Sequence, residues 1–217
     1  MLNMEGLVDA ITKEISAMLS SGSFPIVVGV SNRHVHLSRE HADVLFGKGY
    51  ELTKLRDLRQ PGQFAAKETV TVATAGGVLE NVRILGPIRK NTQFELSAAD
   101  ARKLRIDVPV VKSGSSFKLD TPVLLIGPKG SVSLTEGVGI AWRHIHLSPE
   151  EASILGVKDG QDVDVEVKGD RGVIFRKVWV RVSERFVSEF HVDVDEANAC
   201  GLKTGDYVHI VRIPESL

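Results

Sequence analysis

The chain has 217 residues and an almost balanced charge, with 27 Lys and Arg residues against 28 Asp and Glu residues. This balance excludes a strongly basic protein, so no general affinity for nucleic acid or for a membrane surface is expected, although a local basic groove stays compatible with it. The single cysteine, Cys200, excludes an intramolecular disulfide and a cysteine-rich zinc module.

The first predicted element in chain order is an amphipathic helix within residues 1–22. Its apolar residues recur with the helical period: Leu7, Val8, Ile11, Ile15, Met18 and Leu19. Such a helix docks either on the protein's own core or on another protein, a second copy included, and the pattern leaves both interpretations open. No signal peptide and no apolar run of membrane-spanning length is found, which predicts a cytoplasmic protein.

From Ile26 onward, the sequence predicts a mainly β fold. Short apolar runs, several of them alternating with polar residues at period two, are separated by Gly, Pro, Asp and Asn. Strands of this length and spacing are typical of barrels or sandwiches. The clearest runs are 69–74, 108–112, 122–126, 162–168, 173–182 and 206–212. Helices are expected to be short, the two best defined beginning after Ser38 and Ser148.

An internal repeat contains paired histidines. Residues 29–45 (GVSNRHVHLSREHADVL) and 139–155 (GIAWRHIHLSPEEASIL) are identical at nine of seventeen positions. Alternate residues of a strand point to the same side. The pair His34 and His36, and likewise the pair His144 and His146, therefore projects together and can bind one metal ion. The repeat predicts two related subdomains.

A second match supplies a third ligand in each half. Residues 93–101 (QFELSAADA) align with 189–197 (EFHVDVDEA), which places Glu95 at the position of His191. Each half then has two histidines and one further ligand, and three nitrogen or oxygen ligands with an open position are typical of a catalytic zinc site. Histidine ligands favour zinc over magnesium or calcium. Which ligands share a metal ion, and the distance between the ions, stay open.

Two basic segments lie close to these ligands in the sequence. Arg83, Arg89 and Lys90 surround a Gly-Pro turn just before Glu95, and arginine can hold a phosphate or carboxylate by two parallel hydrogen bonds. Residues 54–67 are basic and suit a mobile loop over an anionic ligand. For both segments an ordinary solvated loop is an equally good interpretation. No phosphate-binding glycine loop and no serine nucleophile motif occurs in the sequence.

Five separated segments resemble, in order, the phosphotransacylases of the propanediol-utilisation type, the phosphate propanoyltransferases. They are GVSNRHVHLS, LRQPGQF, VRILGPIRKNTQFELS, RHIHLSPEEA and EFHVDVDEANA. The resemblance implies two β-barrel domains related by the internal repeat and capped by short α-helices, with an N-terminal helix before them. It implies a first barrel from 23–32 plus 142–217, a second from 33–46 plus 68–141, and a lid over the active site at 47–67.

The same resemblance implies the site residues. Two zinc ions per chain would be held, one by His34, His36 and Glu95, the other by His144, His146 and His191. Arg89 would bind phosphate. Contacts to coenzyme A (CoA) would come from Ser31, Arg83 and Asn198, and the lid would include Gln60, Pro61 and Gly62. The expected enzyme is an acyltransferase that moves a propanoyl or acetyl group reversibly between CoA and inorganic phosphate, giving acyl phosphate plus CoA.

The family also implies a role in propanediol degradation. Some members enter a bacterial microcompartment through an N-terminal extension, with shell or cargo proteins as partners, and the short extension here leaves encapsulation open. Two other functions stay open as well. One is a metal-binding bicupin, although Glu40 and Glu150 are expected on helices, whereas a cupin needs this ligand on a strand. The other is a non-enzymatic scaffold protein stabilised by zinc.

Overall fold

The computed structural model describes residue 8, residues 24–112 and residues 118–212. The N-terminal helix predicted within residues 1–22 therefore lies outside the described residues, apart from Val8. The chain divides into two compact units. Unit 1 contains the described residues within Met1–Gly29, Arg143–His191 and Cys200–Leu217, and unit 2 contains those within Val30–Trp142 and Val192–Ala199.

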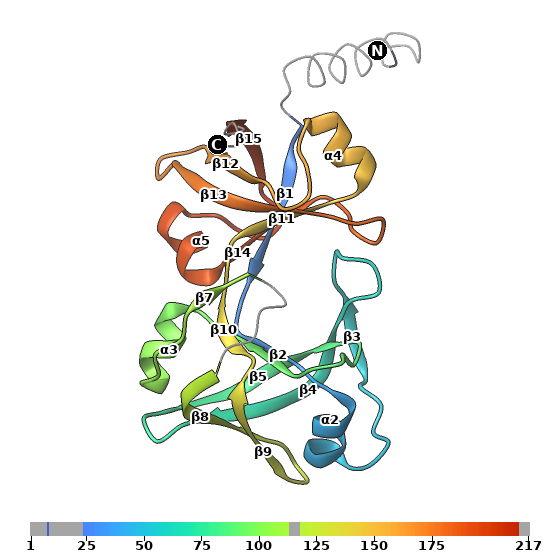
Figure 1. Cartoon of the computed structure of the whole chain (residues 1–217), viewed down its shortest axis with the longest axis vertical. Coiled ribbons are helices and arrows are strands. Elements are labelled where there is room, and N and C mark those ends of the chain that lie inside the picture. The colour runs from blue at the N-terminus through green and yellow to red at the C-terminus, as the bar shows by residue number, and fades with distance from the viewer. Residues whose placement is uncertain (1–7, 9–23, 113–117, 213–217) are drawn as a thin grey trace, which may run out of the picture. The chain divides into compact units, whose positions relative to one another are not determined.

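Unit 1 is built on a closed barrel of six strands (Figure 1). In order around the barrel, these are β1 (Ile26–Ser31), β14 (Glu189–Asp193), β11 (His144–Leu147), β13 (Val173–Val182), β12 (Asp162–Val167) and β15 (Tyr207–Arg212). Strand β11 runs parallel to β13 and antiparallel to β14. Alternate residues of these strands fill the barrel, among them the fully buried Ile145, Val180 and Phe190. The period-two alternation of the sequence thus corresponds to side chains that point alternately into and out of the barrel.

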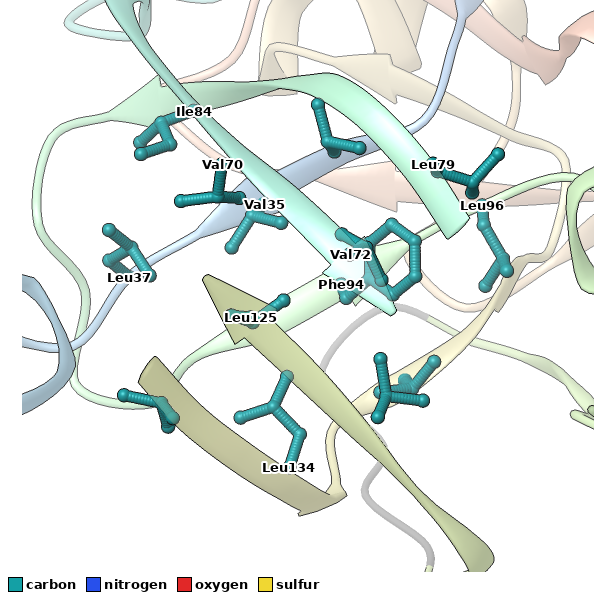
Figure 2. Packing of buried hydrophobic residues seen from close by; sticks show 14 of the residues in the cluster. Val35, Leu37, Val70, Val72, Leu79, Ile84, Phe94, Leu96, Leu125 and Leu134 are labelled. Carbon is teal, nitrogen blue, oxygen red and sulfur yellow. The ribbon is translucent and has the colours of Figure 1, made fainter. Parts of the chain in front are cut away.

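Unit 2 is built on a nine-stranded sheet. Its order is β7 (Val110–Val111), β10 (Val138–Ala141), β6 (Gln93–Glu95), β2 (His34–His36), β5 (Val78–Gly86), β4 (Phe64–Ala73), β8 (Lys118–Ile126) and β9 (Ser131–Glu136), and β3 (Lys54–Asp57) pairs with β4. Figure 2 shows the core that this sheet encloses, where Phe94 of β6 packs among aliphatic side chains such as Val35, Val72 and Leu125. The short strand β2 is therefore fixed from both sides, by β5 and by β6.

Four short helices accompany the strands in the described part of the chain: α2 (Arg39–Phe46), α3 (Ala98–Leu104), α4 (Pro149–Leu155) and α5 (Val194–Cys200). Ser38 and Ser148 cap α2 and α4 as predicted, since each side chain accepts a hydrogen bond from a backbone N–H of the first turn. Glu151 completes a capping box with Ser148. None of the described helices is long and apolar enough to cross a membrane.

The two copies of the repeat adopt the same local structure. In each copy a histidine-containing strand is followed by a serine cap and a short helix, as β2–α2 and β11–α4. Each of these strands pairs in parallel with one neighbour and antiparallel with the other. The predicted mainly β fold with two related β units is confirmed, one unit being a closed barrel and the other a half-barrel sheet.

Candidate active site

The first group of ligands lies in unit 2, where β2 and β6 pair antiparallel. This pairing places Glu95 directly opposite His34, and Gln93 opposite His36. Both histidines are buried, and Nε2 of His34 lies 3.5 Å from Oε2 of Glu95. One ligand atom from each of His34, His36 and Glu95 lies within 4.8 Å of the others. The structure therefore brings together the three residues that the sequence analysis grouped.

Backbone carbonyls orient both imidazole rings of this first group. Nδ1 of His34 lies 2.8 Å from the carbonyl of Asn32, and Nδ1 of His36 lies 3.2 Å from that of Leu85. A carbonyl only accepts, so each Nδ1 carries a hydrogen, and in the neutral ring the lone pair is then on Nε2. Metal-binding histidines are usually held in this way. Nε2 is therefore the ligand nitrogen that this arrangement offers.

The protonation of His36 suits the same role. Burial lowers the pKa of His36 well below its usual value, and the neighbouring His34 and Arg89 lower it further, against a hydrogen bond to Leu85 that raises it. A neutral imidazole is the form that binds a metal ion. The environment of His36 thus favours the ligand form at neutral pH.

The second group lies in unit 1, where β11 and β14 pair antiparallel. This pairing places His191 opposite His144, and Glu189 opposite His146. The ring centroids of the three histidines lie 4.8–5.0 Å apart, and their ligand atoms lie within 4.8 Å of one another. His144 and His146 are buried, and His191 is half-buried. Three convergent imidazoles form a second possible metal site.

Two charged side chains lie beside this second group. The guanidinium of Arg181 lies 3.1 Å from Nε2 of His146, and it also stacks over the rings of Trp179 and Phe186. Oε2 of the buried Glu189 lies 2.9 Å from Nε2 of His191. Neither residue is among those predicted from the sequence. The alignment of 93–101 with 189–197 gave a signal for Glu189, whereas the position of Arg181 depends on the parallel pairing of β11 with β13, which has no signature in the sequence.

The nitrogen of His191 has a geometry that suits a metal ligand. Among the described residues, its Nε2 is buried and has no aligned hydrogen bond, although the carboxylate of Glu189 is close. A buried polar nitrogen without a hydrogen bond is costly, and a metal ion in line with its lone pair would satisfy it. The residues present therefore fit a bound cation.

Arg89 is held next to the first group. Its backbone N–H donates to the carbonyl of Leu37, just after His36. Its guanidinium donates to the amide oxygens of Gln93 at 2.9 Å and of Gln63 at 3.3 Å. Gln93 lies opposite His36, and Gln63 belongs to the segment predicted as a lid. Arg89 thus connects this segment to the first group of ligands.

The other predicted residues also belong to unit 2. Oγ of Ser31 lies 3.5 Å from Nδ1 of His34. Arg83 pairs with His34 across β5 and β2, and its guanidinium donates to the backbone carbonyls of Ala66 and Lys67. Asn198 is exposed on α5. Ser31 and Arg83 therefore lie beside the first group of ligands, while no contact of Asn198 with that group is found among the described residues.

The predicted lid residues form a turn between β3 and β4. Gln60 is buried, whereas Pro61 and Gly62 are exposed. The carbonyl of Gln60 accepts a hydrogen bond from the backbone of Gln63, and Gly62 has a positive φ of 76° that favours glycine. Strand β3 attaches the segment to β4.

The bicupin alternative lacks its carboxylate ligand. Glu40 lies in the first turn of α2 and Glu150 in the first turn of α4, as expected from the serine caps. Neither residue belongs to the groups of potential ligands found among the described residues. The two groups instead take Glu95 and His191 from the strand next to each histidine pair.

Comparison with known proteins agrees with the motifs. A family model described as phosphate propanoyltransferase matches residues 27–203. The chain is 56% identical over 189 residues to a phosphate propanoyltransferase of Thermotoga maritima, which covers 86% of this chain and 89% of the relative. It is 51% identical to one of Lachnoclostridium phytofermentans, covering 87% of this chain and 88% of the relative. It is 46% identical to one of Rhodobacter capsulatus, covering 96% of this chain and 99% of the relative.

The relatives are named as enzymes that transfer an acyl group, so the prediction of an acyltransferase is confirmed at the level of the family. The resemblance seen in the five sequence segments is confirmed over most of the chain. This chain belongs to the phosphate propanoyltransferase family.

Proposed function

We propose that this protein catalyses the reversible transfer of a propanoyl or acetyl group between CoA and inorganic phosphate. The observation that carries the proposal is the pair of three-ligand groups in a chain of this family. In the forward direction, a phosphate oxygen attacks the carbonyl carbon of the thioester, the new C–O bond forms, and the C–S bond breaks. CoA leaves as the thiolate, and the acyl phosphate is the second product.

The metal that suits both groups is zinc, one ion in each. Each group offers three nitrogen or oxygen donors and no fourth histidine, which leaves a position for substrate. Bound zinc supplies Lewis acidity toward the thioester carbonyl and affinity for sulfur and phosphate oxygen. The chain itself orients the imidazoles of the first group through the carbonyls of Asn32 and Leu85.

Arg89 is the residue proposed to hold phosphate. Its guanidinium is positioned by the two amide oxygens of Gln93 and Gln63, and it lies close enough to His36 to lower the pKa of that ring. A guanidinium in this place neutralises part of the charge of phosphate and of the tetrahedral intermediate. It also reduces the repulsion between two anionic substrates, and positioning them is much of the catalytic task.

CoA is proposed to contact Ser31, Arg83 and Asn198. The positions of Ser31 and Arg83 beside His34 support the first two assignments. We further propose that residues 47–67, with Gln60, Pro61 and Gly62 at the turn, act as a lid that orders around Arg89. The hydrogen bond from Arg89 to Gln63 supports this idea. The domain boundaries are proposed from the family resemblance: one barrel comprises 23–32 plus 142–217, and the other comprises 33–46 plus 68–141.

The cellular setting is proposed from the family resemblance alone. It comprises propanediol degradation in the cytoplasm or inside a bacterial microcompartment, with shell or cargo proteins as partners there, and assembly into a homo-oligomer. Co-purification of the protein with intact microcompartments tests the location, and its mass in solution tests the assembly.

The reaction is tested by mixing the purified protein with propanoyl-CoA in the presence and absence of phosphate. We expect free thiol and propanoyl phosphate to appear together, in equal amounts, only when phosphate is present. Thiol release without phosphate would indicate a thioesterase. No release under either condition would contradict an enzyme acting on acyl-CoA and would favour the scaffold alternative.

A further inference from the structure

The two centres use the same strand positions but place their carboxylates differently. In the first centre, β6 carries Gln93 and Glu95, and Glu95 lies opposite the first histidine of its pair, His34. In the second centre, β14 carries Glu189 and His191, and His191 lies opposite the first histidine, His144. The sequence Gln-Phe-Glu of the first centre thus becomes Glu-Phe-His in the second. The carboxylate has moved two residues along the strand, on the same face.

The position of Glu189 resembles that of a group facing a metal ion. Its Oε2 lies 2.9 Å from Nε2 of His191, and His191 has no aligned hydrogen bond there. The corresponding contact in the first centre joins Nε2 of His34 and Oε2 of Glu95 at 3.5 Å. Ligands about 2.0–2.2 Å from a tetrahedral zinc ion lie roughly 3.3–3.5 Å from one another. Both carboxylates therefore lie on the ligand-nitrogen side of an imidazole. The 3.5 Å contact of Glu95 equals this separation, whereas Glu189 lies closer to His191, at an ion-pair distance.

A small residue on the neighbouring strand leaves room for this carboxylate. A Cβ atom at Gly29 of β1 would lie 2.5 Å from Oε1 of Glu189, so a larger residue there would displace the carboxylate. Glu189 is buried, at 8% exposure. Burial of a carboxylate is costly unless a positive partner compensates it. The absence of a side chain at Gly29 therefore leaves the space that this carboxylate occupies.

Charge gives a reason for a carboxylate at the second centre. The first centre combines Glu95 with the cation of Arg89, which lies close to His36. The second has three imidazole ligands and the cation of Arg181, 3.1 Å from Nε2 of His146. A divalent cation added there would lie close to the positive charge of Arg181, and the carboxylate of Glu189 would offset this repulsion. With Glu189, each centre contains one arginine and one carboxylate, and the two net charges become equal.

We propose that Glu189 supplies the carboxylate of the second metal centre. It faces the metal position beside His191, compensates the charge of the ion and thereby raises the affinity of the centre. This inference rests on the proposal that the three histidines of that centre hold a metal ion. Glu189 is a positioning and charge-compensating residue here, in the place that Gln93 occupies, without a carboxylate, in the first centre.

The test measures zinc rather than turnover. Zinc per chain is determined by elemental analysis, and the affinity of each ion by competition with a chromophoric chelator. The first variant is Glu189→Gln, which keeps the size of the side chain and its packing on Gly29. Its control is Glu184→Gln, which removes an exposed carboxylate from the same unit. The second variant combines Glu189→Gln with His191→Glu, which rebuilds in β14 the Gln-Phe-Glu sequence of β6.

We expect the wild type and Glu184→Gln to bind two zinc ions with the same affinities. Glu189→Gln should bind the second ion about 10–100-fold more weakly, as is usual when a group supporting a metal ligand is lost. The combined variant should recover most of this affinity, because the carboxylate is again present beside the histidine pair.

Three results would decide against this inference or its basis. If Glu189→Gln is folded, as checked by circular dichroism and thermal melting, and binds the second zinc ion as tightly as the wild type, the role of Glu189 is overturned. Zinc binding by the combined variant that is weaker than that of Glu189→Gln would overturn the exchange of the carboxylate between positions. A wild type that binds fewer than two zinc ions would instead contradict the proposed function, before any variant is considered.

Discussion

The β2–α2 segment of unit 2 and the β11–α4 segment of unit 1 present a histidine pair in the same way, but their surroundings differ. In unit 2, backbone carbonyls of Asn32 and Leu85 orient the rings, and Glu95 completes the group. In unit 1, two charged side chains contact the rings: Arg181 at His146 and Glu189 at His191. Both copies thus share the antiparallel pairing of the histidine strand with the strand that carries the third ligand.

The difference shows how two repeated groups of potential metal ligands can differ in their neighbours and keep the same strand geometry. Because antiparallel pairing fixes which residues lie opposite each histidine, exchanging side chains on β6 or β14 changes the charge of a centre but not its position. Beside the first centre lies Arg89, the residue proposed to hold phosphate, with its guanidinium fixed by two amides. In the second, Arg181 lies close to His146 and Glu189 lies close to His191.

The largest effects are expected from removing one ligand of each centre. His34→Ala and His144→Ala should each leave one zinc ion per chain instead of two and reduce acyl transfer to background, because the loss of a direct ligand exceeds the ~10–100-fold typical of supporting groups. Elemental analysis and the phosphate-dependent thiol assay measure both effects. His209→Ala, which changes a histidine of β15 outside both groups, is the matched control. Full activity in His144→Ala would remove the second centre from the mechanism.

Substitution of Arg89 should come next in size. Arg89→Ala should lower turnover by about 10²–10³-fold and raise the KM for phosphate, as is typical for the loss of one donor to a developing charge. Arg89→Lys keeps the charge but not the two parallel donors, so it should recover only part of the activity. Steady-state rates at varied phosphate and fixed propanoyl-CoA measure both variants. An unaltered KM for phosphate in Arg89→Ala would contradict the role assigned to this residue.

A smaller effect is expected on the pH dependence of stability in the metal-free protein. His36 has a lowered pKa when folded, because of burial first and of His34 and Arg89 next, while its usual value is 6.5. The unfolded chain therefore binds the proton first as the pH falls. The His36 contribution is fully present above about pH 6.5 and is lost by up to about 1.4 kcal/mol per pH unit below it, down to the lowered pKa of the folded state.

Thermal melting of zinc-stripped protein between pH 8 and pH 5.5 measures this slope. His36→Gln removes the group, so its melting temperature should fall less steeply over the same range. An identical slope in the two proteins would show that other groups cause the pH dependence.

The smallest effects concern the helix caps that follow each histidine pair. Ser38→Ala and Ser148→Ala should each lower the free energy of unfolding by about 1 kcal/mol. Glu151→Ala should cost more than Ser148→Ala, because its carboxylate accepts from the backbone N–H of Ser148 at 2.8 Å and of Ser188 at 3.1 Å. Denaturant unfolding of the three variants measures the order. Equal losses for Glu151→Ala and Ser148→Ala would mean that the second hydrogen bond contributes nothing.

The comparison of the two centres also shows which features a sequence can predict. The side chains of His34 and His36 share a strand face because of period two, and the repeat places His144 and His146 in the same way. Serine caps follow from local chemistry, since the side chains of Ser38 and Ser148 each accept a hydrogen bond from the first turn of their own helix. These features depend on neighbours in the chain, so they were predicted.

Features that depend on strand order were not predictable. Arg181 reaches His146 only because β13 lies parallel beside β11, and Arg83 lies beside His34 only because β5 does the same beside β2. Closure of the barrel depends on the pairing of β1 and β12 with β15, which period two does not specify. Glu189 lies within the aligned segments, but its position beside the histidines could be recognised only from the strand register, which places it opposite His146.

Stepwise return of zinc to metal-free protein tests the account most directly. The protein is stripped with a chelator, zinc is added in fractions of an equivalent, and phosphate-dependent formation of propanoyl phosphate is measured at each step. If both groups hold a metal ion that the reaction needs, activity should stay near zero without zinc and reach its maximum at two equivalents per chain. Full activity in the metal-free protein, or a maximum at one equivalent, would contradict the proposal that the reaction needs a metal ion in each group.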